Sequence, residues 1–248
     1  IAGQSHGGMF LSRSDDGIPL YRLDLVHSVF VKRLNRFVCE ADVQGDRKLL
    51  RLTNTGRLRD LLIEGAEILY RRDRSSKTDG VVVGVMVRGN AALIDTREQA
   101  RAFEAAFYRK LIPWLESFRA FRREASFQGS RFDYAFVYGD QEAFLELKSA
   151  VYLREDGAAM YPDTVSVRGR THIEKLTKIA KTHPAYVVFV AAHPDARFFT
   201  PCDQADPMIR PLLIKARNEG VVVKAVQTFL SGDHWVVWRN SDLRVNLD

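Results

Sequence analysis

Closely spaced turn signals constrain the first third of the chain more than any other feature. Between Leu20 and Arg88, short apolar runs alternate with Gly, Asn and Asp, with little helical periodicity. Strands are expected over 25–31, 36–43, 48–52, 66–70 and 81–87. One helical turn is expected over 59–63. Many short strands with few helices are typical of a small barrel, which leaves few exposed strand edges.

The pattern changes after residue 90, where helices begin to alternate with strands. Thr96, followed three residues later by Gln99, fits the N-cap of a helix that continues with apolar residues at helical spacing. Further strands are expected over 130–138, 141–150, 186–192, 221–230 and 235–238, and further helices over 171–182 and 206–220. This alternation predicts an α/β (α+β) domain with a mixed sheet.

The predicted organisation is a tail and two domains. Residues 1–19 form the tail, and the first eight of them are interpreted as a leader added before Met9. An OB-like β-barrel is predicted for 20–89 and the mixed α/β domain for 90–248. A β-rich first domain that only packs against its neighbour is the alternative to an oligonucleotide-binding barrel.

Composition indicates where such a protein works. The longest apolar run, 185–192, is too short to span a membrane, so no membrane partner is expected. Cys39 and Cys202 are the only cysteines, which excludes a disulfide framework and a cysteine zinc site. The expected compartment is therefore reducing and cytoplasmic, with association with the nucleoid left open.

Charge indicates the class of partner. Lys and Arg number 37 against 31 Asp and Glu, a net charge of +6, which favours a polyanion such as DNA. The basic residues fall into three groups: Arg33 and Arg36; Arg71, Arg72, Arg74 and Lys77; and Arg168, Arg170, Lys175, Lys178 and Lys181. Each group alone is equally well interpreted as a solvated face. The sequence leaves open whether the chain is a monomer or a homodimer.

One predicted hairpin brings two acids and a lysine together. Gly139-Asp140 is a favourable hairpin turn, and pairing around it places residues whose numbers sum to 279 opposite each other. Asp133 then faces Glu146, and Lys148 shares the face of Glu146 because strand side chains alternate. The alternation also predicts that four aromatic residues occupy the other face: Phe132, Tyr134, Phe136 and Tyr138.

This arrangement is typical of a metal nuclease. The Cβ atoms of directly opposed residues lie about 5 Å apart, so two opposed carboxylates repel each other unless a cation lies between them, and Mg²⁺ or Mn²⁺ accepts such ligands. Lys148 would act on water or on developing phosphate charge. An upstream acid on the first helix would complete the pattern called PD-(D/E)xK, and Glu104 is the candidate, with Glu98, Glu116 and Glu124 as competitors. The alternative for Glu146 and Lys148 is a surface ion pair.

Several short motifs occur in the order found in one known family. They are Arg33-Leu34-Asn35-Arg36-Phe37, Asn54-Thr55-Gly56, Ser130-Arg131-Phe132-Asp133, Glu146-Leu147-Lys148, Tyr161-Pro162-Asp163 and Arg168-Gly169-Arg170-Thr171-His172. From about Val26 to Val226 the chain resembles the sugar fermentation stimulation (SfsA) proteins. The resemblance implies DNA binding, an N-terminal OB barrel and a C-terminal PD-(D/E)xK domain. Thr53, Ser149 and Val167 depart from the usual pattern of that family.

Two functions remain open at this stage. The first is a metal-dependent nuclease that uses Asp133, Glu146, Lys148 and Glu104. The second is a DNA-binding regulator of sugar metabolism that retains the scaffold without turnover. The candidate nucleic-acid contacts are the same in both: Arg33, Arg36, Asn54, Arg57, Arg131, Arg168, Arg170 and His172. A sugar-metabolic enzyme is the third class, and no sugar-site motif supports it.

Overall fold

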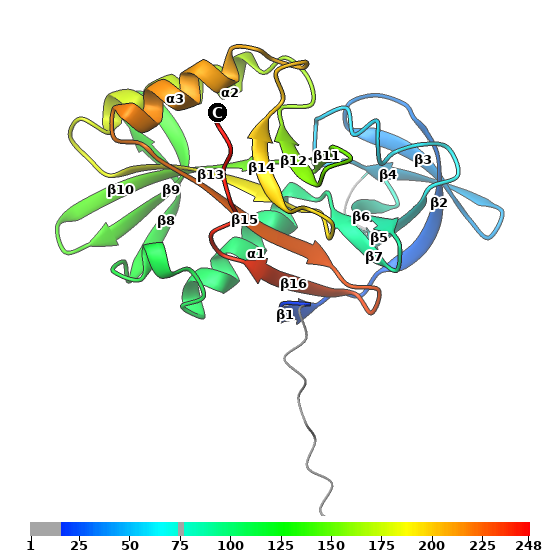
Figure 1. The fold of residues 1–248 in the computed structure, drawn as a ribbon. Coiled ribbons are helices and arrows are strands. Elements are labelled where there is room, and N and C mark those ends of the chain that lie inside the picture. Colours follow the sequence, from blue (N-terminus) through cyan, green and yellow to red (C-terminus); the bar gives the residue numbers. More distant parts are fainter. Residues whose placement is uncertain (1–15, 74–76) are drawn as a thin grey trace, which may run out of the picture.

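The computed structural model describes residues 16–73 and 77–248. Most of the predicted tail and Arg74 of the second basic group lie outside these ranges. Within them, a 13-stranded sheet runs through both halves of the molecule, and a second sheet has three strands. Figure 1 shows the barrel at one end of the molecule and a long hairpin at the other. No helix in the described ranges is long and apolar enough to cross a membrane.

The first half is a closed barrel. Its strands are β2 (Val26–Arg33), β3 (Val38–Val43), β4 (Asp46–Arg51), β5 (Glu67–Arg72) and β6 (Gly80–Val87). The strand order β4-β3-β2-β5-β6 is antiparallel throughout, and a parallel pairing of β4 with β6 closes the ring. This is the topology of an OB fold, so the predicted barrel is confirmed.

The single helical turn expected over 59–63 is present, one residue earlier than expected. The amide groups of Leu61 and Leu62 both bond to the carbonyl of Leu58, which makes one turn that does not continue. Leu58 itself has a φ of +51°, a left-handed conformation that cannot start a right-handed helix.

The second half is built on a mixed sheet, as predicted. Its strands are β7 (Asn90–Leu93), β8 (Ala120–Phe127), β9 (Ser130–Tyr138), β10 (Gln141–Ser149), β13 (Ala185–Ala191), β15 (Val222–Leu230) and β16 (Trp235–Asn240). Strands β10, β13 and β15 are parallel, and the others pair antiparallel. The small sheet contains β11 (Tyr152–Leu153), β12 (Ala158–Tyr161) and β14 (Phe198–Pro201).

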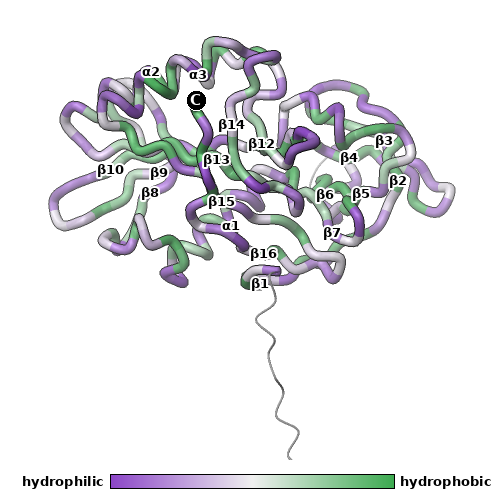
Figure 2. Tube along the Cα trace, viewed as in Figure 1, coloured by the Kyte–Doolittle hydropathy of each residue, from purple (hydrophilic) through white to green (hydrophobic). Residues whose placement is uncertain are grey.

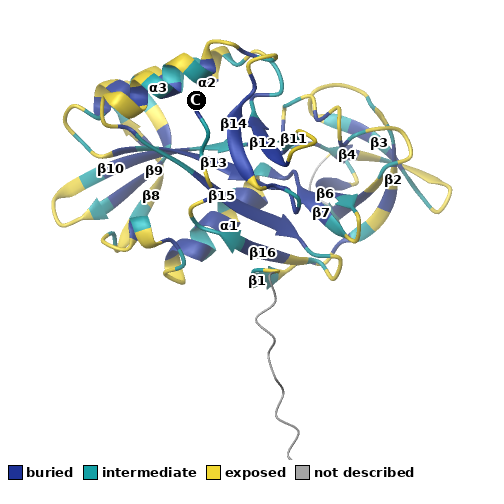
Figure 3. Cartoon of the chain, in the orientation of Figure 1, coloured by how far each residue is buried: buried dark blue, intermediate teal, exposed yellow. Residues whose placement is uncertain are grey.

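Helices cover both faces of this sheet. They are α1 (Thr96–Tyr108), α2 (Val167–Ile179) and α3 (Ile209–Asn218), with a short 3-10 helix, η1 (Pro113–Leu115). Helix α1 packs Phe103 and Phe107 into one core, and α2 and α3 pack Ile173 and Leu213 into another (Figure 1). Strands β13 and β15 between them are apolar and buried along most of their length (Figures 2 and 3).

Two helix starts differ from the sequence prediction. Asp95, not Thr96, is the N-cap of α1, and its carboxylate accepts a hydrogen bond from the amide of Arg97. The predicted capping role of Gln99 is therefore wrong, and its side chain is available for hydrogen bonds outside the helix cap. Helix α2 begins at Val167 rather than near 171, because Ser166 caps it and accepts from the amide of Gly169.

The two halves are joined without a linker. The predicted boundary near 88–90 falls in the turn between β6 and β7, and these two strands pair with each other. Strand β7 also pairs with β15 of the second half. The short strand β1 (Ile18–Arg22), placed by the sequence partly in the tail and partly in the barrel, pairs with β16 instead.

Arg33, at the end of β2, connects two turns of the barrel. Its guanidinium donates to the carbonyls of Asn35 at 3.1 Å and Arg36 at 2.9 Å in the turn after β2. It also donates to the turn after β4, at Asn54, Gly56 and Arg57, over 2.6–3.4 Å. The donors that a phosphate contact needs are already engaged, so the structure gives Arg33 a structural position rather than the predicted nucleic-acid contact.

Replacing Arg33 by Ala should therefore lower the free energy of unfolding by about 2–3 kcal/mol, because several carbonyls lose a charged donor. Urea denaturation at constant m value measures this change. Arg57→Ala is the matched control, since Arg57 is exposed and should stay within about 0.5 kcal/mol of the parent. Equal stability of the two variants would contradict the role of Arg33 in connecting the two turns.

Candidate active site

The predicted hairpin register is confirmed. Tyr138 pairs with Gln141, and Tyr134 pairs with Leu145. Beyond this point β10 continues alongside β13, and the ladder with β9 ends. The amide of Asp133 then donates to Glu146 Oε2 at 3.2 Å, and the amide of Leu147 donates to Asp133 Oδ2 at 2.7 Å. The two carboxylates thus replace the missing ladder partners, which holds them side by side.

The face assignment needs one correction. Tyr134 and Phe136 lie in the core beneath α1, as predicted, but Phe132 packs into the other core with Phe144. The change of face coincides with Glu124 on the neighbouring strand β8, which has a φ of +49°. The pairing of β8 with β9 keeps one register on both sides of Asp133, so the departure concerns the face that Phe132 occupies and not the pairing.

Glu146 lies at the centre of a buried polar cluster. Lys148 Nζ donates to Glu146 Oε1 at 2.8 Å, and the ring Nδ1 of His172 contacts the same oxygen. Lys148 Nζ also lies 3.1 Å from His172 Nδ1. A protonated Nδ1 donates to Glu146, whereas an unprotonated one accepts from Lys148, so the two contacts belong to different protonation states. The side chains of Lys148 and His172 are only 11% and 12% exposed, which rules out a solvated surface ion pair.

The pKa values of the two carboxyl groups move apart. Burial, followed by the charge of Glu146, raises the pKa of Asp133 to about 7. Burial also acts to raise the pKa of Glu146, but hydrogen bonds and charge from His172 and Lys148 outweigh it and lower that pKa to about 2. Adjacent carboxylates with opposite shifts are typical of a functional site.

The cluster opens into a cleft between the two halves, here called the interdomain cleft. Its volume is about 370 Å³. The second half contributes Asp133, Glu146, Lys148 and Arg168, and the barrel contributes Arg36 and the turn 53–56. A second groove, lined by Arg97, Arg101, Glu104 and Arg123, shares four residues with the cleft: Thr96, Asp133, Leu147 and Ser149. Asp133 therefore lies where the two openings meet.

Amide side chains fix the floor of this cleft. Ser149 Oγ accepts from Asn54 Nδ2 at 3.2 Å and from Gln99 Nε2 at 2.9 Å. Asn54 also accepts from the amide of Gly56 at 3.0 Å and is 8% exposed. Thr53 Oγ1 donates to the helix cap Asp95 at 2.9 Å. Asn54 thus positions the barrel turn against the site, and its own polar atoms are engaged in doing so.

Asp163 fixes the same turn from the second half. Its Oδ2 accepts from the amide of Leu58 at 2.8 Å. A Cβ atom at Gly56 would lie 2.7 Å from the same oxygen, so any larger residue here would have to displace the carboxylate of Asp163. Asp163 therefore holds the two halves together at the cleft.

Glu104 is not gathered with the other two acids. Arg123 binds it through two hydrogen bonds of 2.7 and 2.6 Å, and Tyr134 donates to it at 3.0 Å. No set of three His, Cys, Asp or Glu side chains placed for a metal ion occurs within residues 16–73 and 77–248. Glu104 lines the groove beside Asp133, but the structure does not form the predicted three-acid set.

The predicted basic contacts separate into two kinds. Arg36, Arg57 and Arg168 are exposed in or beside the cleft. Arg170 is held by buried Asp206 through hydrogen bonds of 2.7–3.1 Å, so the predicted phosphate contact is replaced by a link between α2 and the start of α3. Arg131 is exposed at the start of β9, opposite Ser126 of β8.

The donor set suits a hard divalent cation. Two adjacent carboxylates provide oxygen ligands. Burial, and after it the charge of Glu146, raises the pKa of Asp133, and a bound cation would offset both effects. Asp133 and Glu146 are the residues that would hold it. Lys148 and His172 already satisfy one oxygen of Glu146, so Asp133 is the more available ligand.

The fold and site together define a class of protein: an OB barrel fused to a mixed α/β domain with a buried Asp, Glu-x-Lys cluster at their junction. The profile described as "SfsA N-terminal OB domain" matches residues 31–94, and "Sugar fermentation stimulation protein RE domain" matches 97–234. The chain belongs to the sugar fermentation stimulation protein (SfsA) family.

Individual relatives are similar over most of their length. The homologue from Pyrococcus furiosus is 37% identical over 85% of this chain and 92% of its own. The homologue from Archaeoglobus fulgidus is 38% identical over 87% and 93%. A solved structure, that of Pyrococcus furiosus SfsA in complex with Ca²⁺, superposes with a TM-score of 0.88 at 36% identity and covers 92% of this chain and 99% of that one.

The opposite pKa shifts predict how stability depends on pH. Between pH 3.8 and about 7, the folded protein keeps a proton on Asp133 that the unfolded chain releases, because folding raises the pKa of this carboxyl group from 3.8 to about 7. The free energy of unfolding therefore falls as pH rises through this window. The expected loss is on the order of 2–4 kcal/mol. Glu146 acts in the other direction: its stabilisation is present above 4.5 and is lost as pH falls towards 2.

Urea denaturation in EDTA between pH 4.5 and 7.5 tests this prediction. Asp133→Asn should remove most of the decline, because the amide oxygen can still accept from Leu147 without titrating. Asp140→Asn, in the exposed hairpin turn, is the matched control and should keep the decline. A parent protein whose stability does not fall in this range contradicts the raised pKa.

Proposed function

We propose that the protein is a metal-dependent nuclease that hydrolyses phosphodiester bonds of nucleic acid, with DNA the expected substrate. The observation that carries the proposal is the buried cluster of Asp133, Glu146 and Lys148 in a cleft with exposed arginines on both sides. The Ca²⁺ complex of the Pyrococcus relative supports a divalent-cation site in this family. Mg²⁺ or Mn²⁺ is the proposed ion for turnover.

The chain's own residues would divide the work as follows. Asp133 and Glu146 hold the cation, which when bound supplies Lewis-acid polarisation of a phosphate. Lys148 places a positive charge beside the reacting phosphate. His172 orients Glu146 through Nδ1, and Arg36 and Arg168 bind flanking phosphates from the two sides of the cleft. Gln99 and Asn54 keep Ser149, next to Lys148, in position.

A second function also has a specific observation in its favour. Glu104 is paired with Arg123 and does not complete a three-acid set. A nucleic-acid-binding regulator without turnover would need only the basic cleft, with Lys148 and His172 balancing the buried charge of Glu146. Affinity without cation-dependent cleavage would identify this function.

Cleavage separates the two functions. Purified protein with single-stranded, duplex and structured nucleic acids should cleave with Mg²⁺ or Mn²⁺ and not with EDTA. Lys148→Ala should reduce the cleavage rate by at least about a hundredfold, while nucleic-acid affinity stays within a few fold, because the lost interaction acts on the transition state. Lys178→Ala, exposed on α2, is the matched control and should cleave normally.

Salt dependence tests the phosphate contacts. Each contact contributes about 0.7–0.9 to the slope of log K against log[salt], so Arg57→Ala and Arg168→Ala should each flatten the slope by nearly one unit. Binding to all sequences should weaken alike, since phosphate contacts carry no base information. Arg217→Ala, exposed on α3, is the control, and a slope change there equal to that at Arg168 would contradict the assignment.

A further inference from the structure

The turn between β2 and β3, residues 34–37, exposes two apolar side chains, and its Arg36 lines the interdomain cleft. We call this segment the 34–37 tip. Leu34 is 47% exposed and Phe37 is 54% exposed, although both lie in a barrel whose other large apolar residues are mostly buried. An exposed aromatic ring adjacent in sequence to an arginine of the cleft is a candidate contact for a partner, because its hydration is unfavourable.

The tip is rigid although it is exposed. Asn35 Oδ1 accepts from the amides of Phe37 at 2.8 Å and Val38 at 3.0 Å. The amides of Leu34 and Asn35 both donate to the carbonyl of Val38, at 2.9 and 3.2 Å. Arg33 holds the carbonyls of the same turn, so the backbone is preorganised. A preorganised backbone reduces the conformational entropy lost on binding to that of the Phe37 side chain.

The surroundings of the tip are cationic. The guanidinium of Arg36 lies 5.8 Å from the centre of the Phe37 ring, a contact weak enough to yield to a phosphate. Arg36 lines both the interdomain cleft and a depression that also contains Arg57 and Arg59. None of the described residues that line this depression is Asp or Glu. A second copy of the chain docked symmetrically here would bring these arginines together, which is unfavourable.

We propose that Phe37 is a stacking platform for an unpaired base of single-stranded nucleic acid, and that Arg36 binds the adjoining phosphate. This inference rests on the proposed function and names the form of substrate that enters the cleft. Bases inside a duplex are covered on both faces by their neighbours, so an aromatic ring can stack only on an unpaired one. Such stacking tolerates any base, because every base has a flat face.

Binding assays in EDTA test the proposal without cleavage. The probes are a labelled oligothymidylate of about 15 nucleotides and a duplex of the same length. Phe37→Ala should weaken binding of the single strand by about tenfold, consistent with the loss of one stacked base. Its affinity for the duplex should change by less than about twofold, and Phe37→Trp should match or exceed the parent on the single strand.

Two further variants sharpen the test. Phe37→Leu keeps apolar bulk without the flat ring and should weaken single-strand binding about as much as Phe37→Ala. Tyr138→Ala is the matched control, because Tyr138 is 58% exposed at the end of β9 and the hairpin turn lies far from the barrel (Figure 1). Melting temperatures on the same samples show that each variant is folded.

The outcomes distinguish a failure of this inference from a failure of the proposed nuclease function on which it rests. Parental single-strand affinity in Phe37→Ala, or its restoration in Phe37→Leu, overturns the stacking platform while the cleavage assignment of Lys148 stands. A parent that binds only duplex overturns it in the same way. A parent that binds neither nucleic acid overturns the proposed function as well.

Discussion

The reciprocal bonding of Asp133 and Glu146 is the interaction on which the rest of the site depends. Where β9 and β10 separate, each carboxylate accepts a backbone amide of the opposing strand that has lost its ladder partner. A buried amide without a partner is costly, so the strands can separate here only because these side chains satisfy them. The same geometry buries two acids side by side, and burial together with the charge of Glu146 raises the pKa of Asp133.

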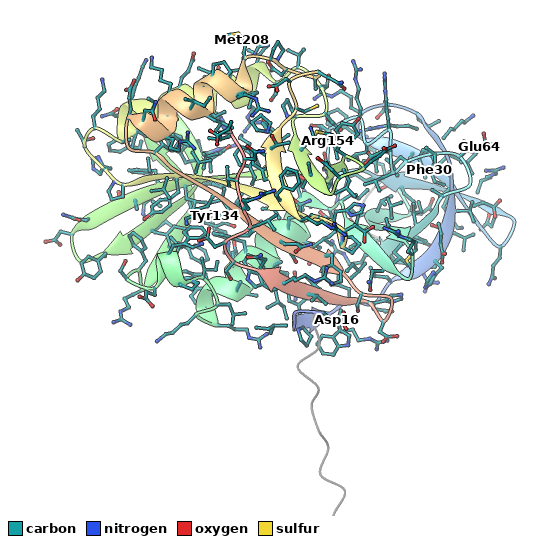
Figure 4. All side chains as sticks on the ribbon, in the orientation of Figure 1. Asp16, Phe30, Glu64, Tyr134, Arg154 and Met208 are labelled. Carbon is teal, nitrogen blue, oxygen red and sulfur yellow. The ribbon has the colours of Figure 1, made fainter. Side chains whose placement is uncertain are left out.

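The barrel contributes to this site mainly through one turn. Arg33 fixes the turn 54–57 from within the barrel, and Asp163 fixes it from the other half. Asn54 then reaches Ser149, three residues beyond Glu146 on β10. Tyr134, labelled in Figure 4, donates to Glu104 of α1 in the neighbouring groove. The site is therefore assembled across the junction of the two halves.

The sequence predicted what depends on local rules. Turn residues and alternation sufficed for the barrel strands and for the register of the hairpin, because a two-residue turn fixes its own pairing. The same rules misplaced Phe132, since they contain no information about the positive φ of Glu124 on the neighbouring strand.

Local rules also cannot predict contacts between distant segments of the chain. Basic residues such as Arg33 and Arg170 are indistinguishable in sequence from phosphate contacts, yet backbone carbonyls and buried Asp206 engage their donors. Because Asp95 caps α1, the side chain of Gln99 is not used in the cap and bonds to Ser149 instead, which the sequence does not indicate.

The continuity of the large sheet has a mechanical consequence. Strand β7 is bonded to β6 of the barrel and to β15 of the second half, so no flexible hinge separates the walls of the cleft. Closure around a ligand by rotation of one domain against the other would require breaking sheet hydrogen bonds. The width of the opening is consequently set when the chain folds. A nucleic acid of the kind proposed above would have to adapt its own shape to reach the buried carboxylates, so substrates would be selected by how readily they deform.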